Sequence, residues 1–159
     1  MMAGLEKPTR GSIKIKGKSI EKMSENALAR FRRKNIGFVF QSYNLLPTLT
    51  AQENVSLPLI FRGVDKKNRN EKAKKLLKQV GLEKHIKHKP NQMSGGQQQR
   101  VGIARAFIGN PDIVFADELT GNLDSKTTAD IMKLITTITR ENNQTLIIVT
   151  HDINIAKYA

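Results

Sequence analysis

The stretch Met93-Ser94-Gly95-Gly96-Gln97-Gln98-Gln99-Arg100 decides how this chain is organised. Ser94 is a good N-cap for the helical run that follows, and the first amides after a cap have no partner inside the helix. Gly95 and Gly96 let those amides approach a ligand closely, because neither residue has a Cβ. The stretch therefore predicts an anion site at a helix N-terminus, with phosphate the commonest ligand. A plain glycine-rich capped turn fits these eight residues equally well. The choice between an anion site and a plain turn therefore depends on the neighbouring motifs.

Working outward, three apolar runs read as strands of a parallel sheet, and helical patterns separate them. Each run is followed by polar side chains: residues 36–40 lead into Gln41, residues 113–116 into Asp117-Glu118, and residues 145–150 into His151-Asp152. Alternating strands and helices predict an α/β fold. Because ligands in such sheets collect at the carboxyl ends of strands, we expect these polar side chains to share one edge.

In this order the motifs resemble the ATP-binding subunit of an ATP-binding-cassette (ABC) transporter. Gln41 is similar to the Q-loop, Ser94 to Gln97 resemble the signature loop, and Asp117-Glu118 resemble the Walker B pair. The run from Gly121 to Asp124 is similar to the D-loop, and His151 to the switch histidine. Five motifs in the right order are far more specific than any one alone. The resemblance implies a P-loop-NTPase-like parallel sheet with an inserted helical subdomain.

The resemblance also assigns a role to each residue, with ATP and Mg²⁺ as cofactors. Asp117 and Gln41 would hold Mg²⁺, which prefers oxygen ligands. Glu118 would accept a proton from the attacking water, and His151 would contact the γ-phosphate. The remaining residues would act on a nucleotide held by a second subunit: Ser94, Gly95, Gly96, Gln97 and Asp124.

Along the chain, one partial domain is expected, with residues 1–41 and 110–159 as core parts and residues 42–109 as the helical subdomain. Thr50 and Glu53 fit a capping box at the start of a short helix, and Pro58 is expected to end that helix. Residues 70–80 have the apolar spacing of an amphipathic helix that ends at Gly81. His85 and His88 match no motif and are expected on the surface.

The phosphate-binding loop of the family is missing from these residues. Such a loop needs Gly, four residues, then Gly-Lys-Ser/Thr between a strand and a helix. Gly17-Lys18-Ser19 has serine at position 12 where the first glycine belongs, and it follows a strand-like segment, so it reads as a hairpin turn. Leu119 is a smaller departure, since the family usually has proline there.

On this resemblance we expect a cassette cut at the N-terminal side, so that the Walker A loop, its strand and the adenine-stacking aromatic residue are absent, and short at the C-terminal side. That loop supplies most triphosphate contacts. The isolated chain should therefore bind ATP weakly without turnover. Residues 117–125 and 40–47 resemble the branch of lipoprotein-release, macrolide-export and antimicrobial-peptide-export cassettes.

Composition limits the compartment and the partners that the protein can have. The chain has 159 residues, no cysteine and a net charge of +13. No apolar run approaches the roughly 20 residues that a membrane span needs. We expect a protein in the cytoplasm, peripheral on the inner face of the cell membrane, with a transmembrane permease and a second ATP-binding subunit as partners. The lysine-rich segment 62–89 lacks a stacking platform, which argues against nucleic acid as a partner. The alternatives are a solvated helix face or one near an anionic membrane surface.

Three rival functions remain open at this stage. The first is an ABC-type ATPase of chromosome maintenance or DNA repair, whose two halves are separated by a coiled coil; no heptads lie between Gln41 and Ser94. The second is a translation-factor cassette acting on ribosomes. The third is a non-catalytic interaction fragment, which the missing phosphate loop favours.

Overall fold

The computed structural model describes residues 2–119 and 124–158. Its centre is a parallel sheet in the order β3–β4–β5, formed by Ile36–Val39, Ile113–Asp117 and Thr145–Val149. A separate antiparallel hairpin joins β1 (Lys14–Ile15) to β2 (Lys18–Ser19). The predicted α/β class with a parallel sheet is therefore confirmed.

The hairpin settles the identity of the Gly17-Lys18-Ser19 segment. Lys16 and Gly17 form its turn with φ of 52° and 73°, a left-handed pair that suits a tight two-residue connection. A short 3-10 turn, η1 (Ile20–Lys22), follows directly. The segment does not join a strand to a long helix, so the prediction of a hairpin turn rather than a phosphate loop is confirmed.

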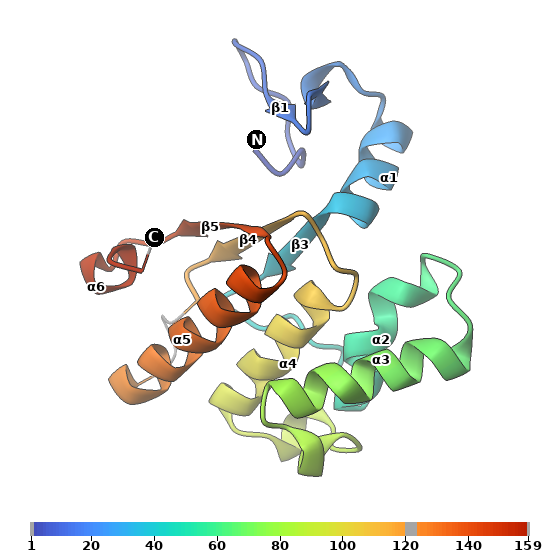
Figure 1. Ribbon diagram of the computed structural model, residues 1–159, viewed down its shortest axis with the longest axis vertical. Helices are drawn as coiled ribbons and strands as arrows, with labels where there is room; N and C mark the ends of the chain where they lie inside the picture. Colours follow the sequence, from blue (N-terminus) through green and yellow to red (C-terminus); the bar gives the residue numbers. More distant parts are fainter. Residues whose placement is uncertain (1, 120–123, 159) are drawn as a thin grey trace.

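The helices surround the parallel sheet: most of them lie on one face and extend beyond it, and the first contributes to the other face (Figure 1). Their bounds are α1 (Glu25–Asn35), α2 (Ala51–Ile60), α3 (Lys66–Gln79), α4 (Gly95–Phe107), α5 (Ser125–Glu141) and α6 (Ile153–Ala156). Short 3-10 turns, η2 (Glu83–His85) and η3 (Pro90–Gln92), connect α3 to α4. None of these helices is long and apolar enough to cross a membrane.

Two apolar clusters hold the chain together. The larger one joins α2 to α5 with the inner side chains of the sheet, such as Val39 and Val114. The smaller one lies on the other face, where Ile15, Leu28 and Phe31 pack near Phe38 and Phe115. Phe38 and Phe115 stack with ring centroids 5.8 Å apart and stay half-exposed.

The structure differs from the expectations at three places. Pro58 lies inside α2, because burial of Val55 and Leu59 outweighs the lost hydrogen bond and the crowding that the ring causes in the preceding turn. Helix α3 begins at Lys66, since Asp65 caps it by accepting from the Asn68 amide at 3.0 Å. His85 and His88 are half-buried, with ring centroids 5.0 Å apart.

Other local predictions are confirmed. Thr50 and Glu53 form the expected capping box at the start of α2. Gly81 follows α3 with φ of 77°, as a helix-terminating glycine does. The division of the chain at residues 41/42 and 109/110 stays a prediction, because α4 packs against both the sheet and the other helices.

Candidate functional site

The parallel strands bring the predicted polar side chains to one edge. Val39 pairs in register with Ala116, and Asp117 pairs with Val149. Gln41 therefore lies two residues beyond Val39, at the level that Glu118 reaches two residues beyond Ala116. His151 follows β5 at the same carboxyl end.

Glu118 and His151 are in direct contact at this edge. The carboxylate oxygen Oε1 of Glu118 accepts from the His151 backbone amide at 3.1 Å and from the ring Nδ1 at 2.9 Å. A carboxylate only accepts, so Nδ1 carries the proton, and Nε2 remains for a ligand. The His151 side chain is 84% exposed and that of Glu118 is 24% exposed.

The backbone conformation of Glu118 determines the direction of its side chain. Its φ is 45°, a left-handed conformation that is costly for a residue with a side chain. Its amide donates to the Val149 carbonyl at 3.0 Å, which ties the turn to β5. The strained turn separates the directions of Asp117, the last residue of β4, and Glu118.

Asp117 and Gln41 are both exposed at the strand ends. Within residues 2–119 and 124–158, no three His, Cys, Asp or Glu side chains converge to hold a metal by themselves. The edge fits Mg²⁺ rather than a tightly enclosed metal, because Mg²⁺ binds through one or two carboxylates together with waters and phosphate oxygens.

The signature-like loop forms the capped helix start that the sequence predicts. Ser94 Oγ accepts from the Gln97 amide at 3.3 Å, and Gln97 Oε1 accepts from the Ser94 amide at 2.9 Å. The Gln98 amide reaches the Ser94 carbonyl at 2.9 Å. The amides of Gly95 and Gly96 thus precede the first intrahelical bond of α4 and remain for an anion.

Gly96 also lies tightly against α5. A Cβ at this position would lie 3.0 Å from Cγ2 of Thr127. The same threonine donates its hydroxyl to Oδ2 of Asp124 at 2.6 Å. The start of α4 and the start of α5 are therefore packed together within one chain.

Asp124 acts as the N-cap of α5. Its Oδ1 accepts from the Lys126 amide at 3.1 Å and the Thr127 amide at 3.0 Å. The hydrogen bonds from Thr127 lower the pKa of this carboxyl below its usual value. The predicted contact of Asp124 with a partner's nucleotide stays a prediction, and Gly121 to Leu123 lie outside the described residues.

Sequence reasoning missed two contacts. Gln99 is fully buried and donates from Nε2 to the Leu119 carbonyl at 3.0 Å, which links α4 to the residue after Glu118. His85 lies with Nε2 3.2 Å from Nε2 of Gln97, beside the signature-like loop. A polar residue at a core-facing position of α4 was the only available signal for the first contact, and nothing local indicated the second.

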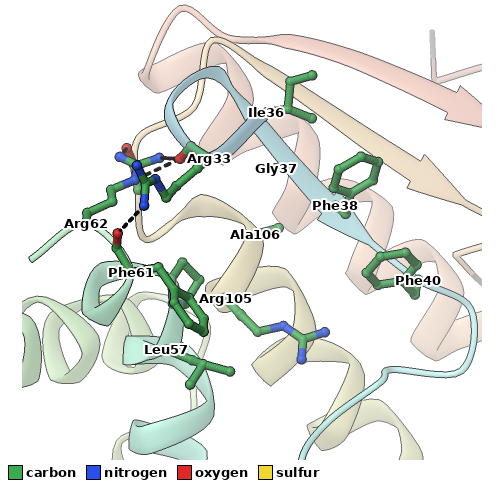
Figure 2. Close-up of a pocket in the computed structure, with 12 residues that line it drawn as sticks. Arg33, Ile36, Gly37, Phe38, Phe40, Leu57, Phe61, Arg62, Arg105 and Ala106 are labelled. Carbon is green, nitrogen blue, oxygen red and sulfur yellow. Dashed lines mark hydrogen bonds between the residues drawn. The ribbon is translucent and has the colours of Figure 1, made fainter. Parts of the chain in front are cut away.

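A groove of about 330 Å³ runs along β3, between this strand, the end of α2 and α4 (Figure 2). Its wall is mainly apolar, with Phe40 and Leu57 among its residues, and three arginines line it: Arg33, Arg62 and Arg105. Arg105 donates from Nη2 to the Tyr43 carbonyl at 2.7 Å and from Nη1 to the Asn44 carbonyl. The groove is thus connected to the segment that directly follows Gln41.

Arg62 links the end of α2 to α1 and to the loop after α4 through hydrogen bonds. It donates from Nε to the Arg33 carbonyl at 2.9 Å and from Nη1 to the Gly109 carbonyl at 2.6 Å. Partial burial, and then the nearby Arg33, lower the pKa of Arg62 from its usual value. A Cβ at Gly109 would lie 2.4 Å from Arg62 Nη2, so a larger residue there would require the guanidinium to shift.

Comparison with known proteins identifies the family of this chain. The family model described as "ABC transporter" matches residues 1–121. An uncharacterized ABC transporter ATP-binding protein of Thermotoga maritima is 52% identical over 149 residues, covering 94% of this chain and 63% of that protein. The uncharacterized ABC transporter ATP-binding protein YbbA of Escherichia coli K12 is 49% identical over 156 residues, covering 98% of this chain and 68% of that protein.

Solved structures agree with the sequence comparison. The dimeric post-hydrolysis state of the ATP-binding cassette MJ0796 bound to ADP and Pi is similar with a TM-score of 0.87 and 46% identity, covering 99% of this chain and 69% of that chain. The likeness places the sheet in the P-loop-NTPase-like class. This chain spans about two thirds of the length of these relatives. It belongs to the family of ABC transporter ATP-binding proteins.

Proposed function

We propose that this chain contributes the Walker B, switch, Q-loop and signature residues of a transporter ATPase that acts as a dimer. The observation that carries the proposal is the Glu118–His151 contact beside Asp117, at the ends of adjacent parallel strands. ATP hydrolysis requires charge neutralisation and a placed water more than covalent chemistry. The edge offers groups for both tasks.

Each side chain has a distinct task in this proposal. Asp117, together with Gln41, would hold Mg²⁺, which would supply positive charge at the phosphates. Glu118 accepts a proton from the attacking water, and the bond to Oε1 keeps the His151 ring in the tautomer whose Nε2 faces away from Glu118. The ring can therefore contact the γ-phosphate through Nε2.

The signature-like loop would serve a nucleotide held by a second ATP-binding subunit. The Gly95 and Gly96 amides, Ser94 and Gln97 form a helix start suited to phosphate, and Asp124 lies close by through Thr127. The related MJ0796 cassette is described as a dimer, which supports a second subunit as partner. Within the family, we propose that this chain belongs to the lipoprotein-release, macrolide-export and antimicrobial-peptide-export branch, which residues 40–47 and 117–125 resemble.

The partner in the membrane would be a permease, with this chain peripheral on the cytoplasmic face. The groove behind Gln41 supports this proposal, because it combines an apolar wall with the guanidinium of Arg105. A permease segment with an apolar face and one carboxylate would complement both features. Arg105 donates to the carbonyls of Tyr43 and Asn44, which closely follow Gln41 in the chain. A permease segment in the groove would therefore alter the position of Gln41.

The 159 residues contain no Gly-x₄-Gly-Lys-Ser/Thr segment, and the nearest match forms a hairpin. We therefore expect this chain, by itself, to bind Mg-ATP weakly and not to hydrolyse it. Isothermal titration calorimetry and a phosphate-release assay on the purified chain test this expectation. Micromolar affinity or steady turnover that Glu118→Gln abolishes would contradict the inactivity and support a complete site.

A mixed-dimer experiment tests the catalytic proposal itself. A full-length relative that hydrolyses ATP is given a disabled signature serine, so that its own copies cannot complete a site. Adding this chain should restore phosphate release, because Ser94 completes the site in trans, and Ser94→Arg should remove the effect. Restoration that is equal with Ser94→Arg would contradict the role of the signature-like loop.

A further inference from the structure

Two histidines that the proposed catalysis does not use lie in the turn between α3 and α4. His85 and His88 are half-buried there, with ring centroids 5.0 Å apart. Nε2 of His85 lies 3.2 Å from Nε2 of the Gln97 side chain, in the signature-like loop. Within the described residues, Nδ1 of each histidine is buried and has no hydrogen-bond partner. Buried polar atoms are almost always paired, so this arrangement needs a physical reason.

The contacts of Gln97 fix which of its side-chain atoms faces His85. A backbone amide only donates, so the atom that lies 2.9 Å from the Ser94 amide is the carbonyl oxygen Oε1. The side-chain nitrogen Nε2 therefore faces the histidine and donates to it. His85 accepts through an unprotonated Nε2, and the proton of its neutral ring lies on Nδ1. The contact with Gln97 thus requires the tautomer that leaves a buried N–H without a partner.

The turn that carries His85 is anchored on its other side to the start of α2. The His88 carbonyl accepts from the Ala51 amide at 2.8 Å. The Ile86 carbonyl accepts from the Gln52 amide at 3.1 Å. These two amides open α2 and have no partner inside that helix. Because the turn is fixed to α2, the His85 ring is held in a defined place against the signature-like loop.

Gln97 transmits this constraint to the start of α4. Its Oε1 accepts from the Ser94 amide, and its own backbone amide donates to Ser94 Oγ at 3.3 Å. This reciprocal pair fixes both the backbone and the hydroxyl of Ser94. The direction of the next two amides, those of Gly95 and Gly96, follows from the backbone of Ser94.

We propose that His85 is a positioning residue for the signature-like loop, which it orients through Gln97. His85 does not touch the nucleotide. It holds the Gln97 side chain against Ser94, so that the loop keeps the conformation suited to phosphate. The buried Nδ1–H is then explained, because only that tautomer accepts from Gln97. The benefit for phosphate binding rests on the proposed function, whereas the hydrogen bond itself does not.

The tautomer of His85 is the first test. Long-range proton–nitrogen spectra of the ¹⁵N-labelled chain distinguish protonated from unprotonated ring nitrogens, and His85→Gln identifies the His85 signals by removing them. At mildly alkaline pH we expect a protonated Nδ1 and an unprotonated Nε2 in this ring. A proton on Nε2 would overturn the proposal, because that atom could not accept from Gln97.

Hydrogen exchange of the Ser94 amide tests whether the constraint reaches the loop. His85→Leu removes the acceptor, so this amide should exchange about fivefold faster, because losing one neutral hydrogen bond changes an equilibrium by about that factor. His85→Gln places a carbonyl oxygen near the position of Nε2 and should restore slow exchange. His88→Leu is the matched control, since it removes a neighbouring half-buried ring that has no hydrogen bond to Gln97 in the described part of the chain. It should leave the exchange of the Ser94 amide unchanged.

The mixed-dimer assay tests the consequence for the nucleotide. Restored phosphate release should fall about fivefold with His85→Leu, recover with His85→Gln and stay unchanged with His88→Leu. Equal losses in the two leucine variants, or no recovery with His85→Gln, would overturn the positioning role. If the unchanged chain restores no release, the proposed function fails. The tautomer and the exchange of the Ser94 amide then still decide whether His85 orients the loop.

Discussion

Polar side chains at the sheet edge and in the helical region differ in their burial and hydrogen bonding. In the helical region, Asn54 is fully buried, accepts from the Leu46 amide at 2.8 Å and faces three carbonyls at 3.1 Å. At the sheet edge, His151 is exposed and Glu118 has a strained backbone. Polar groups in the first region stabilise the fold, whereas those at the edge are accessible to solvent and, in our proposal, to a nucleotide.

The largest expected effect of a single substitution tests the helical half of this comparison. Asn54→Ala leaves the Leu46 amide and several carbonyls without their partner, so we expect a loss of about 3 kcal/mol in the free energy of unfolding. Urea unfolding followed by circular dichroism measures it. The neighbouring Gln52→Ala, on the same helix, should change stability by less than about 0.5 kcal/mol. Equal effects of the two substitutions would contradict the assignment of Asn54.

The two capping boxes sharpen the comparison, because they have the same chemistry in different places. Thr50→Ala and Ser94→Ala should each cost about 1 kcal/mol of stability through the lost N-cap. Only Ser94→Ala should also reduce the restoration of phosphate release in the mixed dimer. If Thr50→Ala reduced that restoration as much, the loop at Ser94 would have no special role.

Acid unfolding probes the capping carboxylates of both regions. Hydrogen bonds from Asn68 lower the pKa of Asp65, and hydrogen bonds from Thr127 lower the pKa of Asp124, below the ordinary 3.8. Since the folded pKa is lowered, this stabilisation is present above pH 3.8 and is lost as pH falls through the lowered values. Urea midpoints measured across this range should fall less steeply for Asp65→Asn and Asp124→Asn. An unchanged slope in both variants would show that the caps do not form.

The smallest expected effect on stability is at the sheet edge. Glu118→Gln keeps an acceptor for His151 and alters an exposed pair, so the free energy of unfolding should change by less than about 0.5 kcal/mol. Thermal unfolding checks this prediction. A loss comparable to that of Asn54→Ala would mean that the edge carries structural rather than functional side chains.

Local patterns in the sequence predicted much of this comparison. The Thr50–Glu53 box, the Ser94 cap and the turn at Gly17 depend on residues within a few positions, and all three form. The shared edge of Gln41, Asp117 and His151 followed from the order of strands. Strand ends of a parallel sheet leave little choice about where these side chains go.

Long-range contacts could not be predicted in the same way. The Gln99–Leu119 bond spans 20 residues and the Arg62–Gly109 bond spans 47, and each depends on how helices pack. The helix through Pro58 also depends on packing, because Val55 and Leu59 are buried on both sides of it. Tertiary burial overrides the local signal at each of these positions.

The most direct test of the central claim is a titration of the isotopically labelled chain with Mg-ATP, followed by nuclear magnetic resonance. Our account predicts that millimolar nucleotide shifts the backbone signals of Gln41, Asp117, Glu118 and His151 together, while the hairpin at Gly17 is unaffected. Shifts confined to one strand end, or centred on Gly17 and Lys18, would contradict the shared nucleotide edge.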